Sequence, residues 1–199
     1  MDSGYMDYDP AFFTDLELKQ FGFYQIGKNV KISSKCSFYS IRGSIGDNVR
    51  IDDFCILKGE VDIGSNVHIC SFSMVSGAQA RVYLSHFCVL AARCSIYTGS
   101  NNHSATALPA PLAPEAYSSQ IIGPVHVGVG VMVGAHVVIL PNTWIGDGAG
   151  IGAGCVVSGQ VAEGSMLRSA RPTTLTNKRN VQAIRKMIAR YFEITRAGV

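Results

Sequence analysis

Large apolar side chains recur at every sixth position along most of this chain of 199 residues. These nineteen anchor positions form four runs separated by register slips: Ile26, Ile32, Phe38; Ile45, Ile51, Leu57, Ile63, Ile69, Val75; Leu84, Leu90, Ile96; and Ile121, Val127, Val133, Ile139, Ile145, Ile151, Val157. Self-similarity at so short a period is typical of an architecture built from stacked coils.

The fourth residue after each anchor is small or β-branched, with exceptions at Arg42 and Gln79, which each precede a slip. An α-helix would instead repeat its apolar residues three and four positions apart. Glycine, which interrupts helices, also recurs through the repeats. The pattern therefore predicts an all-β fold in which one short strand and one turn form a six-residue unit. Three units make a triangular coil, so nineteen units give about six coils.

Short helices are expected at both ends of the repeats. Thr14 and Glu17 have the spacing of a capping box, and Gly22 is a suitable stop, so residues 1–25 should form a helical cap. The repeats should occupy residues 26–166 of a single domain. Residues 167–199 should form a tail and a helix, because Val181, Ile184 and Ile188 have helical spacing.

The slips indicate where the repeats carry additional structure. One residue is inserted between Phe38 and Ile45, and three are inserted between Val75 and Leu84. Nineteen extra residues separate Ile96 from Ile121, so an excursion loop is expected over residues 99–120. Long loops inside compact repeats are usually functional.

Composition limits the possible classes of protein. Apolar residues make up 47% of the chain and charged residues 16%, which suits a continuous core. No apolar stretch has the length of a membrane span, and the N-terminus lacks the pattern of a signal peptide, so we expect no stable membrane insertion. Five of the six cysteines occupy the small-residue position, which predicts buried, reduced thiols and a cytoplasmic protein: Cys36, Cys55, Cys88, Cys94 and Cys155.

The charge is distributed unevenly, although the net value is only +3. From Arg168 onward there are eight basic residues and one acidic residue. This basic C-terminal segment is expected to be a solvated surface, with binding of an anionic ligand as the alternative. We expect no nucleic-acid partner.

Of the five histidines, His103 is the candidate for catalysis. His68 and His126 precede anchors and should point outward from a flat side, and His86 and His136 fall in turns. His103 lies in the excursion beside Asn102, where the repeat does not dictate the residue type. An unperturbed imidazole pKa of about 6.5 suits proton abstraction near neutral pH.

The repeats resemble the hexapeptide-repeat family, whose fold is a left-handed parallel β-helix with eighteen residues per coil. The excursion with Asn102-His103 is similar to that of the xenobiotic and galactoside acetyltransferases, in which the loop carries the catalytic histidine. The segment from Arg93 to Tyr97 resembles acetyltransferases of surface-polysaccharide synthesis, which implies substrate-binding roles for both residues. Family members are homotrimers with sites between prisms.

The resemblance implies transfer of an acetyl group from acetyl-CoA to a sugar hydroxyl, with His103 as general base and Asn102 beside it. The pantetheine would lie in a groove of small residues, and basic residues of the tail would meet the coenzyme phosphates. The groove residues are Gly134, Ala135, Gly152, Ala153 and Gly154, and the basic residues are Arg171 and Lys178.

Two alternatives remain open, and a third is disfavoured. One is N-acetylation of a nucleotide-linked amino sugar, and another is a non-catalytic binding or scaffold protein of the same fold. A metal enzyme like the hexapeptide carbonic anhydrases would need three clustered histidines, which the spacing does not provide, so we expect no metal site.

Overall fold

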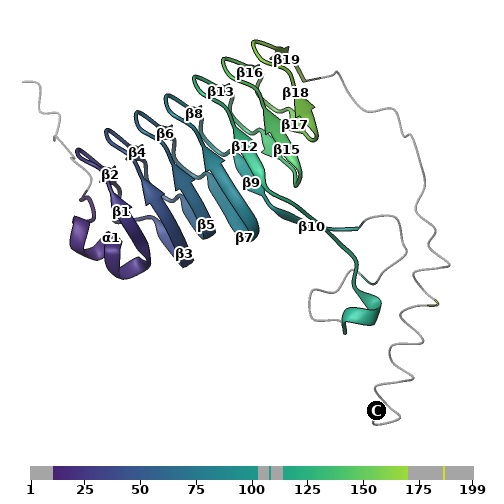
Figure 1. Cartoon of the computed structure of the whole chain (residues 1–199), viewed down its shortest axis with the longest axis horizontal. Coiled ribbons are helices and arrows are strands. Elements are labelled where there is room, and N and C mark those ends of the chain that lie inside the picture. Colours follow the sequence, from purple (N-terminus) through teal and green to yellow (C-terminus); the bar gives the residue numbers. More distant parts are fainter. Residues whose placement is uncertain (1–10, 103–107, 109–113, 170–185, 187–199) are drawn as a thin grey trace, which may run out of the picture.

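The computed structural model describes residues 11–102, 108, 114–169 and 186. They form a parallel β-solenoid of about seven turns with one short helix, α1 (Asp15–Phe21), at the N-terminal end (Figure 1). The strands are β1 (Phe23–Ile26), β2 (Lys31–Ile32), β3 (Ser37–Ile45), β4 (Arg50–Ile51), β5 (Ile56–Ile63), β6 (His68–Ile69), β7 (Met74–Leu84), β8 (Val89–Leu90), β9 (Ser95–Tyr97), β10 (Gly99–Asn101), β11 (Gln120–Ile122), β12 (Val125–Val127), β13 (Met132–Val133), β14 (Val138–Ile139), β15 (Thr143–Ile145), β16 (Gly150–Ile151), β17 (Val156–Val157), β18 (Gln160–Val161) and β19 (Met166–Leu167).

The strands build three flat faces. The first face contains β1, the ends of β3, β5 and β7, and then β12, β15 and β18. The second face is a sheet of seven strands in the order β19-β16-β13-β8-β6-β4-β2. The third face contains the beginnings of β3, β5 and β7, followed by β9, β14 and β17. Every pairing on these faces is parallel, so the predicted parallel β-helix of hexapeptide units is confirmed.

The anchors fill the interior of the prism because each strand directs alternate side chains inward. Ile51, Leu57 and Ile69 are fully buried and belong to one continuous apolar core. The five cysteines of the small-residue position are buried and free, as predicted. Their thiols act as small apolar fillers, and burial raises the pKa of the Cys88 thiol to about 11.

Two details of the repeat count were wrong. Ile121 is not an anchor, because it lies in β11 outside the prism and its side chain is 50% exposed. The repeats also continue beyond the last predicted anchor. The unit after Val157 is shortened, because the next inward residue is Val161. Val161 then pairs with Ile145 and Leu167 with Ile151, so the stack has about seven coils and not about six.

The N-terminal cap has the predicted capping box. The Thr14 backbone N–H donates to Glu17 at 2.7 Å, and the Glu17 N–H donates to the Thr14 hydroxyl at 3.3 Å. Gly22 ends the helix with φ of +123°. Leu18 is fully buried against the first coil, so α1 closes the open end of the core. The predicted C-terminal helix lies almost entirely outside the described residues, and no helix within them is long and apolar enough to cross a membrane.

Candidate active site

The register slips of the sequence fall at one corner of the prism, between the third and first faces. The chain there forms three long strands, β3, β5 and β7, which run around the corner (Figure 1). The pairing of β3 with β5 shifts between Tyr39 and Arg42, and that of β5 with β7 shifts between Gly59 and Val61. Irregularities of this kind bend strands and are frequent beside active sites.

The excursion leaves from the same corner, one coil further on. Strand β9 pairs with β7 on the third face, and the chain then departs through β10 and returns through β11. The two form an antiparallel hairpin, so the excursion predicted as a loop has a strand-paired base. Thr98 fixes this base, since its buried hydroxyl donates to the Ser76 carbonyl at 2.9 Å and accepts from the Ala80 N–H at 3.2 Å.

Asn102 stands at the end of that hairpin. Its backbone N–H donates to the Ser119 carbonyl at 2.8 Å, and its side-chain amide donates to the Ser119 hydroxyl at 3.3 Å. Tyr97 is the last residue of β9 and lies half-buried near the same corner. The structure thus places Tyr97 just before the hairpin and Asn102 at its end, whereas His103 lies outside the described residues.

A groove of about 560 Å³ follows this corner along the three long strands; we call it the corner groove. It is lined by Tyr39, Ser40, Arg42, Lys58, Gly59, Glu60, Gly77, Ala78, Gln79 and Ala80. Gly59 adopts φ of +70°, and a Cβ on Gly77 would collide with the Glu60 carbonyl oxygen. Small residues therefore let the coils stack closely at a corner where each coil carries extra chain. The sequence identified these positions as slips but gave no sign that they form one groove.

The predicted coenzyme groove lies at a different corner, between the second and third faces; we call it the glycine corner. The structure brings its five residues together, because the Gly134 N–H donates to the Ile151 carbonyl and the Gly154 N–H donates to the Ala135 carbonyl. A Cβ on Gly134 would stand only 2.6 Å from the Ala153 nitrogen. Arg171 and Lys178, predicted to meet the coenzyme phosphates, lie outside the described residues.

Arg93 belongs to the glycine corner and not to the corner groove. It adopts φ of +63°, and its guanidinium lies 5.3 Å from the centre of the Phe72 ring, which in turn stacks on Phe54. The His136 N–H donates to the Ala92 carbonyl beside it. Arg93 and Tyr97, predicted together as substrate-binding residues, therefore mark opposite edges of the third face.

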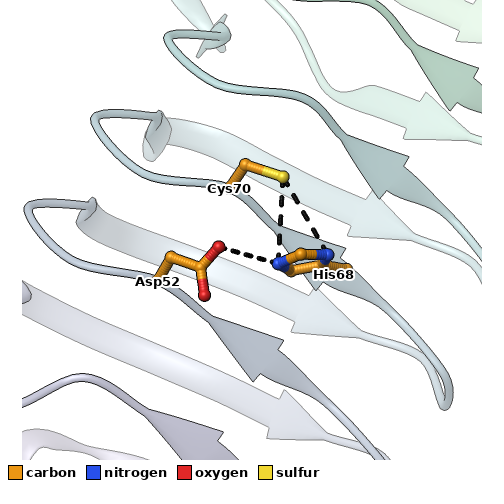
Figure 2. A group of neighbouring side chains, drawn as sticks. All are labelled: Asp52, His68 and Cys70. Carbon is orange, nitrogen blue, oxygen red and sulfur yellow. Dashed lines mark hydrogen bonds and ion pairs between the residues drawn. The ribbon is translucent and has the colours of Figure 1, made fainter. Parts of the chain in front are cut away.

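Asp52, His68 and Cys70 form a cluster on neighbouring coils that the sequence analysis did not predict (Figure 2). The imidazole Nε2 lies 2.8 Å from the Asp52 carboxylate, whose other oxygen accepts from Arg50 Nε at 2.7 Å. Cys70 Sγ stands 3.9 Å from Nδ1 and 3.8 Å from Nε2, so it lies over the ring face. The eighteen-residue coil period, which stacks Asp52 and Cys70 one coil apart, was the signal available in the sequence.

This cluster offers oxygen, nitrogen and sulfur donors, the set that Zn²⁺ prefers. A metal on His68 must lie in the plane of the ring, whereas the sulfur lies above it, and the in-plane direction from Nε2 is taken by Asp52. Burial also raises the pKa of the Cys70 thiol, which disfavours the thiolate that a metal binds. The observed arrangement is a hydrogen-bonded cluster, and an ion would require the Cys70 side chain to rotate.

The remaining histidines lie where the repeat predicted. His126 points outward from the first face and stacks between Tyr83 and Trp144, with ring centres 4.4 and 4.8 Å away. Burial between these rings lowers the pKa of its imidazole. His86 lies in a turn and accepts a hydrogen bond from the Ser65 N–H at 2.8 Å, and His136 lies in a turn with φ of +59°.

The fold and the corner excursion define a hexapeptide-repeat transferase. Residues 43–77 match the family described as bacterial transferase hexapeptide (six repeats). The dTDP-4-amino-4,6-dideoxy-D-glucose acyltransferase of Escherichia coli is 38% identical to this chain over 151 residues, covering 74% of this chain and 78% of that protein. The chain belongs to the hexapeptide-repeat transferase family and is an acyl-CoA-dependent acyltransferase.

Solved structures agree with this assignment. AntD, an N-acyltransferase from Bacillus cereus in complex with dTDP and 3-hydroxybutyryl-CoA, is 34% identical and superposes with a TM-score of 0.76 over 95% of this chain and 98% of that chain. A point mutant of AntD in complex with dTDP-4-amino-4,6-dideoxyglucose and coenzyme A gives the same identity and TM-score over 92% and 99%.

These relatives correct the predicted chemistry. The expectation of acetyl transfer to a sugar hydroxyl was wrong, because the relatives with substantial identity are acyltransferases of an amino sugar and an N-acyltransferase. The alternative of N-acylation on a nucleotide-linked amino sugar agrees with them. The expectation failed because it relied on the resemblance of Asn102-His103 to enzymes that acylate a hydroxyl. Two loop residues do not determine whether the acceptor is an amine or a hydroxyl.

Proposed function

We propose that this protein is an N-acyltransferase that transfers an acyl group from acyl-CoA to the amino group of dTDP-4-amino-4,6-dideoxyglucose or a close analogue. The supporting observation is the 38% identity to the Escherichia coli enzyme over most of both chains. The fold adds a groove at the base of the excursion, where an elongated acceptor can lie. Acetyl-CoA is the donor predicted from the sequence, and the 3-hydroxybutyryl-CoA bound by AntD is the other candidate.

The reaction needs a neutral amine and a stabilised oxyanion. The amine nitrogen attacks the thioester carbonyl carbon, the C–S bond breaks, coenzyme A leaves as the thiol, and the nitrogen loses one proton. Backbone N–H groups that face the developing oxyanion usually supply the largest part of such catalysis. In this chain the glycine corner would hold the pantetheine, and the hairpin that ends at Asn102 would position the acceptor.

A complete site would draw on two copies of the chain. The glycine corner and the corner groove lie at opposite edges of the third face, so one prism presents donor and acceptor elements on separate corners. A trimer of prisms can join the glycine corner of one copy with the excursion of the next, and we therefore retain the homotrimer as part of the proposal.

Acceptor choice is tested by supplying two acceptors that differ only at the reacting position: dTDP-4-amino-4,6-dideoxyglucose and the sugar with a hydroxyl in place of the amine. Each is incubated with acetyl-CoA or 3-hydroxybutyryl-CoA while thiol release and product mass are followed. We expect acylation of the amino sugar alone. Turnover of the hydroxyl sugar at a comparable rate, or of neither, would overturn the proposal.

An amine acceptor also changes what His103 is expected to do. A sugar amine becomes nucleophilic once deprotonated by solvent, so His103→Ala should lose activity near neutral pH and keep most of its rate at high pH. The pH profile of kcat/KM for the two enzymes measures this. A loss of about 10²- to 10⁴-fold that persists at high pH would instead show that a positioned base is obligatory.

A further inference from the structure

The corner groove contains two cations that have no counter-ion within the part of the chain that the structure describes. Arg42 extends from β3 and Lys58 from β5, on adjacent coils, and both are exposed. Tyr39 lies opposite Lys58 in the register of these strands and Arg42 lies opposite Glu60, so the two cations line one groove but are offset by one coil and by two residues along β5. None of the ion pairs found among the described residues involves either one.

The acidic residue in the groove does not neutralise them. The Glu60 carboxylate accepts from Arg81 Nε at 3.0 Å, and the same guanidinium reaches Asp62 at 3.2 Å. Glu60 thereby compensates Arg81, and the hydrogen bond that Arg81 donates to Glu60 raises the pKa of the guanidinium. Arg42, Lys58 and Arg81 outnumber Glu60 and Asp62, so this corner keeps a net positive charge, and Arg42 and Lys58 are its cations without an ion pair among the described residues.

We propose that Arg42 and Lys58 bind the diphosphate of the nucleotide-linked acceptor, with the base stacked on Tyr39. A guanidinium and an ammonium that line one groove suit a diphosphate, because both donate charge-assisted hydrogen bonds to phosphate oxygens. Tyr39 is opposite Lys58 in the strand register and its side chain is 55% exposed, so its ring is available for a base. The identity of the nucleotide rests on the proposed function.

The position of the groove favours the nucleotide-linked acceptor, and not coenzyme A, as the source of the bound diphosphate. Gln79, at the far end of the groove, packs where a side chain on Gly99 would stand, at the start of the excursion. A diphosphate on Arg42 and Lys58 would therefore place the acceptor in a groove whose far end adjoins the base of the excursion. The glycine corner, where the pantetheine is expected, lies across the third face.

The test measures binding of dTDP, dTMP and coenzyme A to the full-length protein by titration calorimetry. Arg42→Ala and Lys58→Ala should each weaken dTDP binding about 10- to 100-fold, the usual cost of one charge-assisted hydrogen bond. The loss should be smaller for dTMP and absent for coenzyme A. Arg42→Lys should recover part of the affinity. Lys28→Ala is the matched control, because Lys28 is an exposed cation at a turn outside the groove.

Tyr39→Leu separates the base from the phosphates, since it should weaken dTDP and dTMP equally. Unchanged dTDP affinity in Arg42→Ala and Lys58→Ala, a loss shared by coenzyme A, or no dTDP binding by the unmodified protein would each overturn the assignment. The proposed function can fail independently of this site. If the protein binds dTDP through Arg42 and Lys58 but does not acylate the amino sugar, the proposed function is wrong and the diphosphate site stands. Circular dichroism of each variant verifies folding.

Discussion

At the residue scale, the solenoid uses single side chains in two distinct ways. Inside, cysteine and valine fill the small-residue positions of the core, and burial raises the pKa of the Cys88 and Cys94 thiols. Outside, ladders of side chains follow the coils because equivalent residues of successive coils lie opposite each other in the parallel register. Tyr83, His126 and Trp144 form such a ladder on the first face.

His126 should make stability depend on pH. Burial between the two rings lowers its pKa below the unfolded value of 6.5, so the unfolded chain binds more protons between the two values. The contribution of His126 is therefore fully present above pH of about 6.5 and is lost as the pH falls toward the lowered pKa. We expect the Tm of the unmodified protein to fall more steeply over this range than that of His126→Gln. Parallel Tm curves from thermal denaturation would contradict this expectation.

At the scale of elements, the corners rather than the strands differ from coil to coil. The strands of the second face are only two residues long, yet they repeat without interruption. The corner between the third and first faces carries the inserted residues, the bulges and the excursion. The glycine corner instead carries small residues, which keep its backbone accessible.

The glycine corner yields a prediction about the donor. Ala153 is exposed, so Ala153→Phe should fold normally while its ring occupies the surface over which the pantetheine is expected to pass. The KM for acyl-CoA should rise at least tenfold, with little change in the KM for the acceptor. Ala162→Phe, an exposed alanine at another corner, is the control. If steady-state kinetics show equal KM values for acyl-CoA in both variants, the coenzyme lies elsewhere.

At the scale of the whole molecule, the prism is a stack of coils whose corners carry the two candidate binding sites. The stacking of about seven coils fixes the distance between the corner groove and the excursion, because each coil advances by one strand spacing. The third face separates these elements from the glycine corner, so the proposed function combines them in a single site only if two copies of the chain meet.

A homotrimer is therefore the expected state in solution. Light scattering at micromolar concentration should give three times the chain mass. At substrate concentrations where the Ala153→Phe chain and the Arg42→Ala Lys58→Ala chain each turn over slowly, mixing the two should restore part of the activity. Restoration is expected because mixed trimers contain sites with an intact corner from each parent. A monomer that is fully active would show that both corners serve one site within a single chain.

The sequence by itself determined the fold and much of its detail. The six-residue period requires each anchor to point inward, and that constraint is local, so the faces, the buried cysteines, the outward histidines and the N-terminal capping box were all predictable. Ile121 was misassigned for the same reason: its spacing fits the period, but only hairpin pairing with Ser100 shows that it lies outside the prism. The sequence pattern also did not predict whether the acceptor is an amine or a hydroxyl, since either group can be acylated beside the same loop.

Only the tertiary structure decided which distant residues share a site. In the sequence, Arg42 and Gln79 are unrelated exceptions to the repeat and Lys58 is an ordinary outward position. They line one groove because parallel coils bring residues of successive turns to a common corner. The same stacking places Asp52 beside His68 and Cys70, and it separates Arg93 from Tyr97 although they are four residues apart in the chain. The physical reason is that the period fixes whether a side chain points in or out, whereas its neighbours across coils depend on the number of residues that each corner inserts.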